Sequence, residues 1–98
     1  MPPVCTVGPI RIGPGEPLAV IAGPCVLEAP ETNERIARTL AEACSALDLP
    51  FIFKGSFDKA NRSSIRSPRG PGLAAGVAEL CRIRNSVGVP VTTDIHEP

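Results

Sequence analysis

The apolar run Leu18-Ala19-Val20-Ile21-Ala22, which ends at Gly23-Pro24, predicts the first core strand of the fold. Consecutive apolar residues without polar alternation are typical of a strand that is buried on both faces in a parallel sheet. The shorter runs Phe51-Ile52-Phe53 and Val89-Pro90-Val91-Thr92-Thr93 predict two more strands. The sequence therefore predicts a small parallel sheet.

Two amphipathic segments separate the predicted strands. Apolar residues recur at helical spacing from about Thr32 to Leu47, and again from Leu73 to Val87, where Gly88 provides a natural stop. The order of strand, helix, strand, helix and strand is a βαβαβ unit of the α/β class, for which right-handed crossovers are expected.

A β-hairpin is expected ahead of this unit. Val4-Cys5-Thr6-Val7 and Ile10-Arg11-Ile12 flank the turn residues Gly8-Pro9. We expect residues 1–15 to form a hairpin cap and residues 18–98 to form the βαβαβ segment. A single domain is expected, because 98 residues with 43% apolar content bury only a modest core.

Composition narrows the classes of function. Ten basic and ten acidic residues give zero net charge, and Trp and Tyr are absent, which argues against a partner that is nucleic acid or membrane. The longest uncharged apolar stretch, residues 18–27, is too short to span a bilayer, and no secretory signal is expected. The four cysteines show no CxxC spacing, so reduced thiols in a cytoplasmic protein are expected.

Polar residues follow each predicted strand. Cys25 comes just after the first strand, Lys54 ends the second, and Asp94 and His96 follow the third. Parallel strands end at the same edge of a sheet, and this edge is where α/β proteins bind ligands. We therefore expect these side chains to surround one site.

Positive charge is concentrated after the second predicted strand. Half of the ten basic residues lie between positions 54 and 69, namely Lys54, Lys59, Arg62, Arg66 and Arg69. With the neighbouring Asn61 and Ser63, they supply the ammonium, guanidinium, amide and hydroxyl donors that bind phosphate or carboxylate oxygens. A solvated loop is the alternative, and the strand-end position of Lys54 favours the anion site.

Residue type alone leaves the roles of the other strand-end residues open. Cys25 is a metal ligand, a nucleophile or a buried filler. Asp94 and His96 are a metal pair, an acid/base pair or contacts to sugar hydroxyls, or Asp94 caps a helix or braces the loop; a polar substrate contact is favoured for Asp94. The role of His96 stays open. Cys44 and Cys81 lie within or beside apolar helix faces and are expected to be buried and inert.

Three segments resemble the 3-deoxy-D-manno-octulosonate 8-phosphate synthase family in their order and spacing. They are Phe53-Lys54-Gly55-Ser56-Phe57-Asp58-Lys59-Ala60-Asn61-Arg62-Ser63-Ser64, Arg69-Gly70-Pro71-Gly72 and Thr93-Asp94-Ile95-His96-Glu97. The resemblance covers the chain from about Leu18 onward. The related 3-deoxy-D-arabino-heptulosonate 7-phosphate synthases share Gly23-Pro24-Cys25 but carry a Lys-Pro-Arg-Thr type of motif in the basic loop. Lys59-Ala60-Asn61-Arg62 favours the octulosonate family.

The resemblance implies a reaction between two anionic substrates. Phosphoenolpyruvate condenses with arabinose 5-phosphate, releases inorganic phosphate and gives the eight-carbon sugar acid needed for lipopolysaccharide synthesis. On this family pattern, Lys54, Ser56 and Lys59 would bind the carboxylate and phosphate of phosphoenolpyruvate.

The same resemblance implies contacts with the sugar. Asn61, Arg62 and Ser63 would bind the phosphate of arabinose 5-phosphate, partly across a subunit boundary. Asp94 would contact the sugar hydroxyls or the aldehyde end, and Lys59 and Asp94 would be the catalytic residues. Positioning and charge neutralisation would be the main task of these groups.

The resemblance also implies that Cys25 is a metal ligand. The residue after Gly23-Pro24 is Cys in the metal-dependent class and Asn in the metal-independent class, so Cys25 implies a divalent ion, Zn²⁺ or Fe²⁺. The family's other ligands have no counterpart in these 98 residues, and His96 is not the matching histidine. We therefore expect no tight metal binding by this chain alone.

The family fold is a (β/α)8 TIM barrel, which typically takes about 250 residues. This chain would supply the N-terminal hairpin, the first three strands and two helices, an incomplete barrel that is expected to be inactive by itself. A homo-oligomer, a tetramer, is expected of the full-length enzyme. The alternatives are a non-catalytic module that binds a phosphorylated ligand, and the related heptulosonate synthase.

Overall fold

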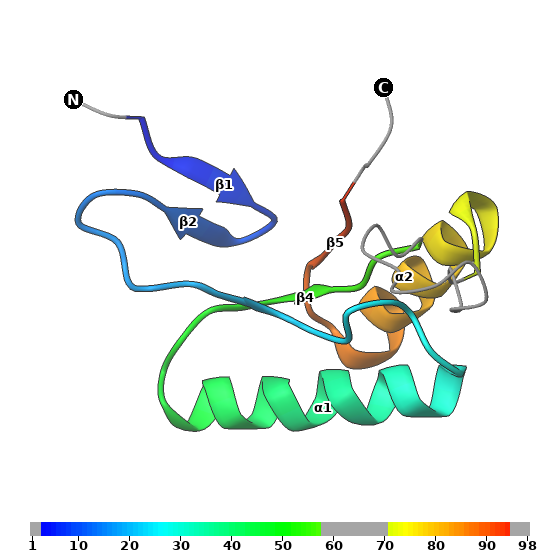
Figure 1. Ribbon diagram of the computed structural model, residues 1–98. Helices are drawn as coiled ribbons and strands as arrows, with labels where there is room; N and C mark the ends of the chain where they lie inside the picture. Colours follow the sequence, from blue (N-terminus) through cyan, green and yellow to red (C-terminus); the bar gives the residue numbers. More distant parts are fainter. Residues whose placement is uncertain (1–2, 58–70, 95–98) are drawn as a thin grey trace.

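In residues 3–57 and 71–94, which this computed structural model describes, three parallel strands form the central sheet (Figure 1). They are β3 (Val20–Ala22), β4 (Phe51–Lys54) and β5 (Val91–Thr92), in the spatial order β3-β4-β5. Val20 lies opposite Phe51, and Lys54 lies opposite Thr92. The predicted sheet is confirmed, with a first and a third strand that are shorter than expected.

Two helices connect the strands. α1 (Pro30–Ala46) begins two residues earlier than predicted, because Pro30 occupies the first turn, where a missing N–H costs no helical hydrogen bond. α2 (Leu73–Val87) has the predicted bounds. Gly88 follows it with a left-handed φ of 81° and donates its N–H to the carbonyl of Arg84, which ends the helix.

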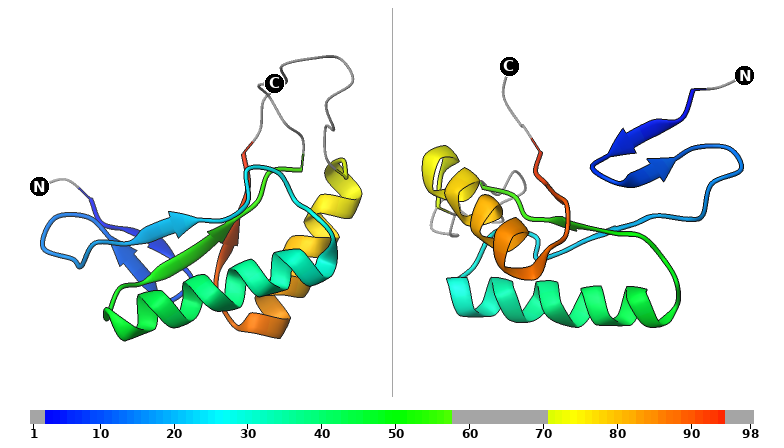
Figure 2. Two further views of the ribbon diagram at one scale, coloured as in Figure 1. Left: turned by 60° about the horizontal axis from the view of Figure 1, so that its bottom comes forward. Right: turned by 180° about the vertical axis from the view of Figure 1, so that it is seen from behind.

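Both helices cover the same face of the sheet and lie side by side (Figure 2). Phe51 and Phe53 point from β4 into a core between the sheet and the helices, and side chains alternate along a strand. The helices contribute Ala37, Cys44, Leu80 and Ile83 to this core. Ile52 and Lys54 therefore project from the opposite face of β4. Cys44 is buried as predicted, whereas Cys81 is only half-buried.

The N-terminal hairpin lies across the sheet from α1, near the amino ends of the strands (Figure 1). β1 (Cys5–Val7) pairs antiparallel with β2 (Ile10–Ile12), and Gly8 takes a left-handed φ of 56° in the turn. This turn approaches Pro90, just before β5. The hairpin is therefore remote from the carboxyl ends of the strands.

None of the helices in the described ranges is long and apolar enough to cross a membrane.

Candidate functional site

The carboxyl ends of β3, β4 and β5 meet at one edge of the sheet, and polar residues gather there. Lys54 is the last residue of β4 and pairs with Thr92 of β5, which brings Asp94 to the same edge. Gly23 and Cys25 follow β3 at this edge. The predicted convergence of Cys25, Lys54 and Asp94 on the strand ends is therefore confirmed by the topology.

The Lys54 ammonium has two polar neighbours within the described part of the chain. Its Nζ donates to the Ser56 hydroxyl at 3.1 Å and lies 3.6 Å from Oδ2 of Asp94. The side chains of Lys54 and Asp94 are 36% and 35% exposed, so both stay accessible to a ligand. Among the described residues, the contact with Ser56 is a hydrogen bond and the contact with Asp94 is an ion pair. An ammonium has three N–H donors, so the partly exposed Lys54 ammonium can also donate to an anionic ligand oxygen.

Ser56, whose hydroxyl accepts from this ammonium, is buried and bonded through its backbone. The residue is 3% exposed, its carbonyl accepts the Leu27 N–H at 2.9 Å, and it forms a parallel bridge with Val26. Gly55, immediately before it, donates to the Thr92 carbonyl at 3.2 Å, and a Cβ atom there would overlap Leu27. Glycine at position 55 therefore lets Leu27 pack under the site.

Cys25 is exposed, which contradicts the alternative that it is a buried filler. It follows the Gly23-Pro24 turn, where Gly23 lies so close to the Lys54 backbone that a side chain would overlap the Lys54 carbonyl. Within residues 3–57 and 71–94, no group of three or more His, Cys, Asp or Glu side chains could hold a metal. The described part of the chain thus supplies one candidate ligand and does not by itself form a metal centre.

Several predicted site residues lie outside the described ranges. These are Lys59, Asn61, Arg62, Ser63 and His96, together with Arg66 and Arg69. The structure does describe the chain on either side of residues 58–70. The Gly72 N–H donates to the Phe57 carbonyl at 3.0 Å, and Phe57 packs so closely on Gly76 of α2 that a Cβ atom at Gly76 would overlap it.

Residues 3–98 match the DAHP synthetase I family. The chain belongs to this family. Among curated relatives, it is 50% identical to the 2-dehydro-3-deoxyphosphooctonate aldolase of Desulfotalea psychrophila over 88 residues, 90% of this chain and 31% of that protein. The aldolase of the same name from Legionella pneumophila is 54% identical over 85 residues, 87% of this chain and 31% of that protein.

The chain thus spans about a third of the length of these curated relatives. A further 2-dehydro-3-deoxyphosphooctonate aldolase, from Alkalilimnicola ehrlichii, is 54% identical over 87 residues, 89% of this chain and 31% of that protein. This name and octulosonate 8-phosphate synthase denote the same enzyme. The resemblance to the octulosonate synthases is therefore confirmed.

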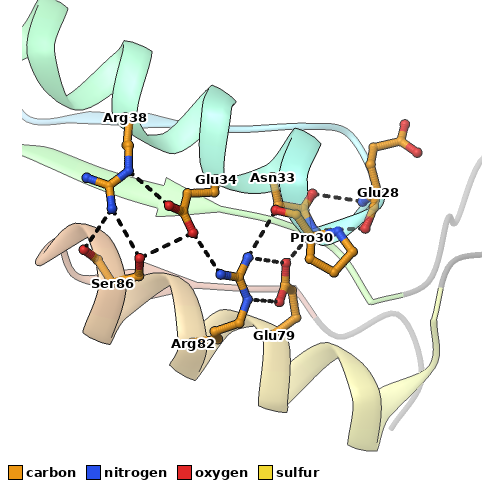
Figure 3. A network of polar contacts seen from close by, with 8 residues as sticks. All are labelled: Glu28, Pro30, Asn33, Glu34, Arg38, Glu79, Arg82 and Ser86. Carbon is orange, nitrogen blue, oxygen red and sulfur yellow. Dashed lines mark hydrogen bonds and ion pairs between the residues drawn. The ribbon is translucent and has the colours of Figure 1, made fainter.

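A polar network between α1 and α2 of this DAHP synthetase I member was missed by the sequence analysis (Figure 3). Arg82 donates to both carboxylate oxygens of Glu79, at 2.7 and 3.0 Å, and to Glu34 of α1 at 2.8 Å. Arg38 donates to Glu34 at 3.0 Å and to Ser86 at 3.2 Å. These hydrogen bonds link residues 34–38 of α1 to residues 79–86 of α2.

The same network shifts the pKa values of Glu34, Glu79 and Arg82. Hydrogen bonds from Arg82 hold the pKa of Glu34 and of Glu79 below the ordinary value of a glutamate. The two carboxylates in turn raise the pKa of the Arg82 guanidinium. The spacings Glu34–Arg38 and Glu79–Arg82 were the available sequence signal, since such neighbours share a helix face. That signal does not show that the two helix faces meet.

Proposed function

We propose that the protein containing this chain condenses phosphoenolpyruvate with arabinose 5-phosphate to give 3-deoxy-D-manno-octulosonate 8-phosphate and inorganic phosphate, in the synthesis of a lipopolysaccharide precursor. The observation that carries this proposal is the half-exposed Lys54 ammonium, which lies beside Ser56 and Asp94 at the carboxyl edge of the sheet. Identities of 46–54% to the octonate aldolases support it.

The site chemistry suits a reaction between two anions. Lys54 and Ser56, with Lys59, would bind the carboxylate and phosphate of phosphoenolpyruvate, because ammonium and hydroxyl donors form charge-assisted hydrogen bonds to such oxygens. These contacts would hold C3 of phosphoenolpyruvate against the aldehyde carbon while water attacks C2. The positive charge would stabilise the negative charge that develops before phosphate leaves.

The sugar would bind through residues of the basic loop together with Asp94. Asn61, Arg62 and Ser63 would take its phosphate, because a guanidinium fork and polar donors match three phosphate oxygens. Asp94, which is half-exposed and 3.6 Å from the Lys54 ammonium, would accept hydrogen bonds from the sugar hydroxyls or lie at the aldehyde end. Lys59 and Asp94 are the proposed catalytic residues.

Cys25 would be one ligand of a divalent ion, Zn²⁺ or Fe²⁺. Its exposure at the strand edge is compatible with this role. The remaining ligands would come from parts of the whole protein other than these 98 residues, so no step of the reaction is assigned to the metal.

The whole protein would be a (β/α)8 barrel that assembles as a cytoplasmic homo-oligomer, a tetramer. The helices of this chain cover one face of the sheet, as in the outer ring of such a barrel. The other face carries Ile21, which is 53% exposed in the described structure and would lie in the barrel interior.

Phosphate release tests the reaction. The protein containing this chain is incubated with phosphoenolpyruvate, a divalent metal and either arabinose 5-phosphate or erythrose 4-phosphate. We expect phosphate release only with the five-carbon sugar. Release only with erythrose 4-phosphate would identify a heptulosonate synthase, and ligand binding without release under any condition would identify a non-catalytic module.

A further inference from the structure

Asn33 is a fully buried polar residue in the first turn of α1, and all of its side-chain hydrogen-bonding groups are used. Its Oδ1 accepts the Glu28 N–H at 2.8 Å, and its Nδ2 donates to the Glu28 carbonyl and to Glu79 Oε2, each also at 2.8 Å (Figure 3). The residue is 0% exposed. Losing one of these partners would leave a buried polar group unsatisfied, which is costly.

The two hydrogen bonds to Glu28 fix the backbone that enters α1. Ala29 precedes the helix and has no side chain that can cap it. Asn33 instead reaches back and holds the backbone N–H and carbonyl of Glu28 together. One end of the segment 23–28, which contains Cys25, is therefore attached to α1.

The other end of this segment is attached to β4. Leu27 donates its N–H to the Ser56 carbonyl at 2.9 Å, Val26 forms a bridge with Ser56, and Gly23 lies against the Lys54 backbone. The segment that carries Cys25 is thus held at one end by Asn33 of α1 and at the other by β4 and the residue Ser56 that follows it.

Glu79 orients the amide of Asn33 from α2. Arg82 binds both oxygens of Glu79, so this acceptor is itself held in place. A residue 46 positions away in the sequence thereby determines how Asn33 presents its amide to Glu28. The hydrogen bond between Asn33 and Glu79 therefore connects the interface of α1 and α2 to the segment 23–28 at the carboxyl edge of the sheet.

We infer that Asn33, oriented by Glu79, is a positioning residue that sets where the Cys25 segment lies relative to Lys54 and Ser56. The contacts of residues 23–28 with Asn33 and with β4 are properties of the fold. Its importance for the chemistry of the site rests on the proposed function. The test therefore uses readouts that need neither substrate nor metal, so that its failure is distinguishable from failure of the proposed function.

The experiment compares Asn33→Ala with Arg38→Ala in the protein that contains this chain. Arg38 also links α1 to α2, through Ser86, but does not contact Glu28, so it is the matched control. Iodoacetamide labelling is followed at each cysteine by peptide mass spectrometry. The exposed Cys5 in the hairpin serves as the internal reference for the exposed Cys25.

We expect Asn33→Ala to raise the labelling rate of Cys25 relative to Cys5 at least threefold, and Arg38→Ala to leave this ratio unchanged. Hydrogen exchange of the Leu27 amide, which donates to the Ser56 carbonyl, should accelerate in the same variant relative to the Phe53 amide of the core strand. A lower melting temperature with unchanged ratios would overturn the inference, as would equal changes in Arg38→Ala.

Glu79→Ala provides a second, milder variant, which keeps both bonds between Asn33 and Glu28 but releases the Asn33 amide from α2. It should raise the Cys25 labelling ratio in the same direction by a smaller factor. Adding it to Asn33→Ala should bring no further change, because the two residues act through one contact. If Asn33→Ala does not fold, the inference is tested with Glu79→Ala alone. An unchanged ratio of Cys25 to Cys5 labelling in that variant would overturn the inference.

Discussion

Gly23 shows how closely β3 and β4 approach at the end that carries the candidate site. A Cβ atom at this position would overlap the Lys54 carbonyl oxygen, so the strands would have to separate. We expect Gly23→Ala to lower the free energy of unfolding by about 3–4 kcal/mol, as measured by urea denaturation. Gly88→Ala is the control, because it meets open space at a φ of 81° and should cost only about 1–2 kcal/mol. Equal losses in the two variants would contradict this account.

Lys54 is expected to contribute to ligand binding far more than to stability, because its side chain is half-exposed. Lys54→Met should weaken phosphoenolpyruvate binding about 10- to 100-fold, since a charge-assisted hydrogen bond contributes about 1.5–3 kcal/mol. Isothermal titration calorimetry measures this loss. Arg11→Met, which removes the exposed ion pair with Glu16 in the hairpin, should leave binding unchanged. An unaltered affinity in Lys54→Met would exclude the proposed anion site.

The α1–α2 pair should lose stability in acid. Arg82 holds the pKa of Glu34 and Glu79 below their ordinary value of 4.5, so the folded carboxylates keep their charge at a pH where the unfolded ones become protonated. The stabilisation is therefore fully present above about pH 4.5 and disappears as the pH falls below it.

Arg82→Met tests this pH dependence. The difference in melting temperature between the parent protein and Arg82→Met should be constant near neutral pH and shrink as the pH falls below about 4.5. Arg11→Met, which breaks an exposed pair, should give a small difference at every pH. A difference that stays constant down to pH 3 would show that the carboxylates of this network do not stabilise the helix pair.

The exposed part of the sheet face opposite the helices, at Ile21, tests the architecture of the whole molecule. Ile21 is 53% exposed in the described structure, and the proposed barrel would bury it. In the protein containing this chain, Ile21→Asp should cost about 3 kcal/mol or more, because a buried unpaired charge is strongly unfavourable. Leu47→Asp, at a residue that is 70% exposed beyond the end of α1, should change the melting temperature little. Similar small effects in both variants would argue against a closed barrel.

Much of the element order and part of the site could be predicted. The apolar runs and helical spacing located β3, β4, α1 and α2 to within a few residues, and the strand-end rule placed Lys54 and Asp94 at one edge. The burial of Ser56 was not predicted, because it depends on the bridge to Val26 in another part of the chain.

The sequence by itself determined the α/β class, the order of elements and the edge where the polar residues gather, because periodicity and strand direction are local properties. Only the tertiary structure decided that Asn33 meets Glu79 and that Gly23 lies against Lys54. Those contacts join residues that are far apart in the sequence. They depend on how α1 packs on α2 and on the register of β3 with β4, which no local pattern specifies.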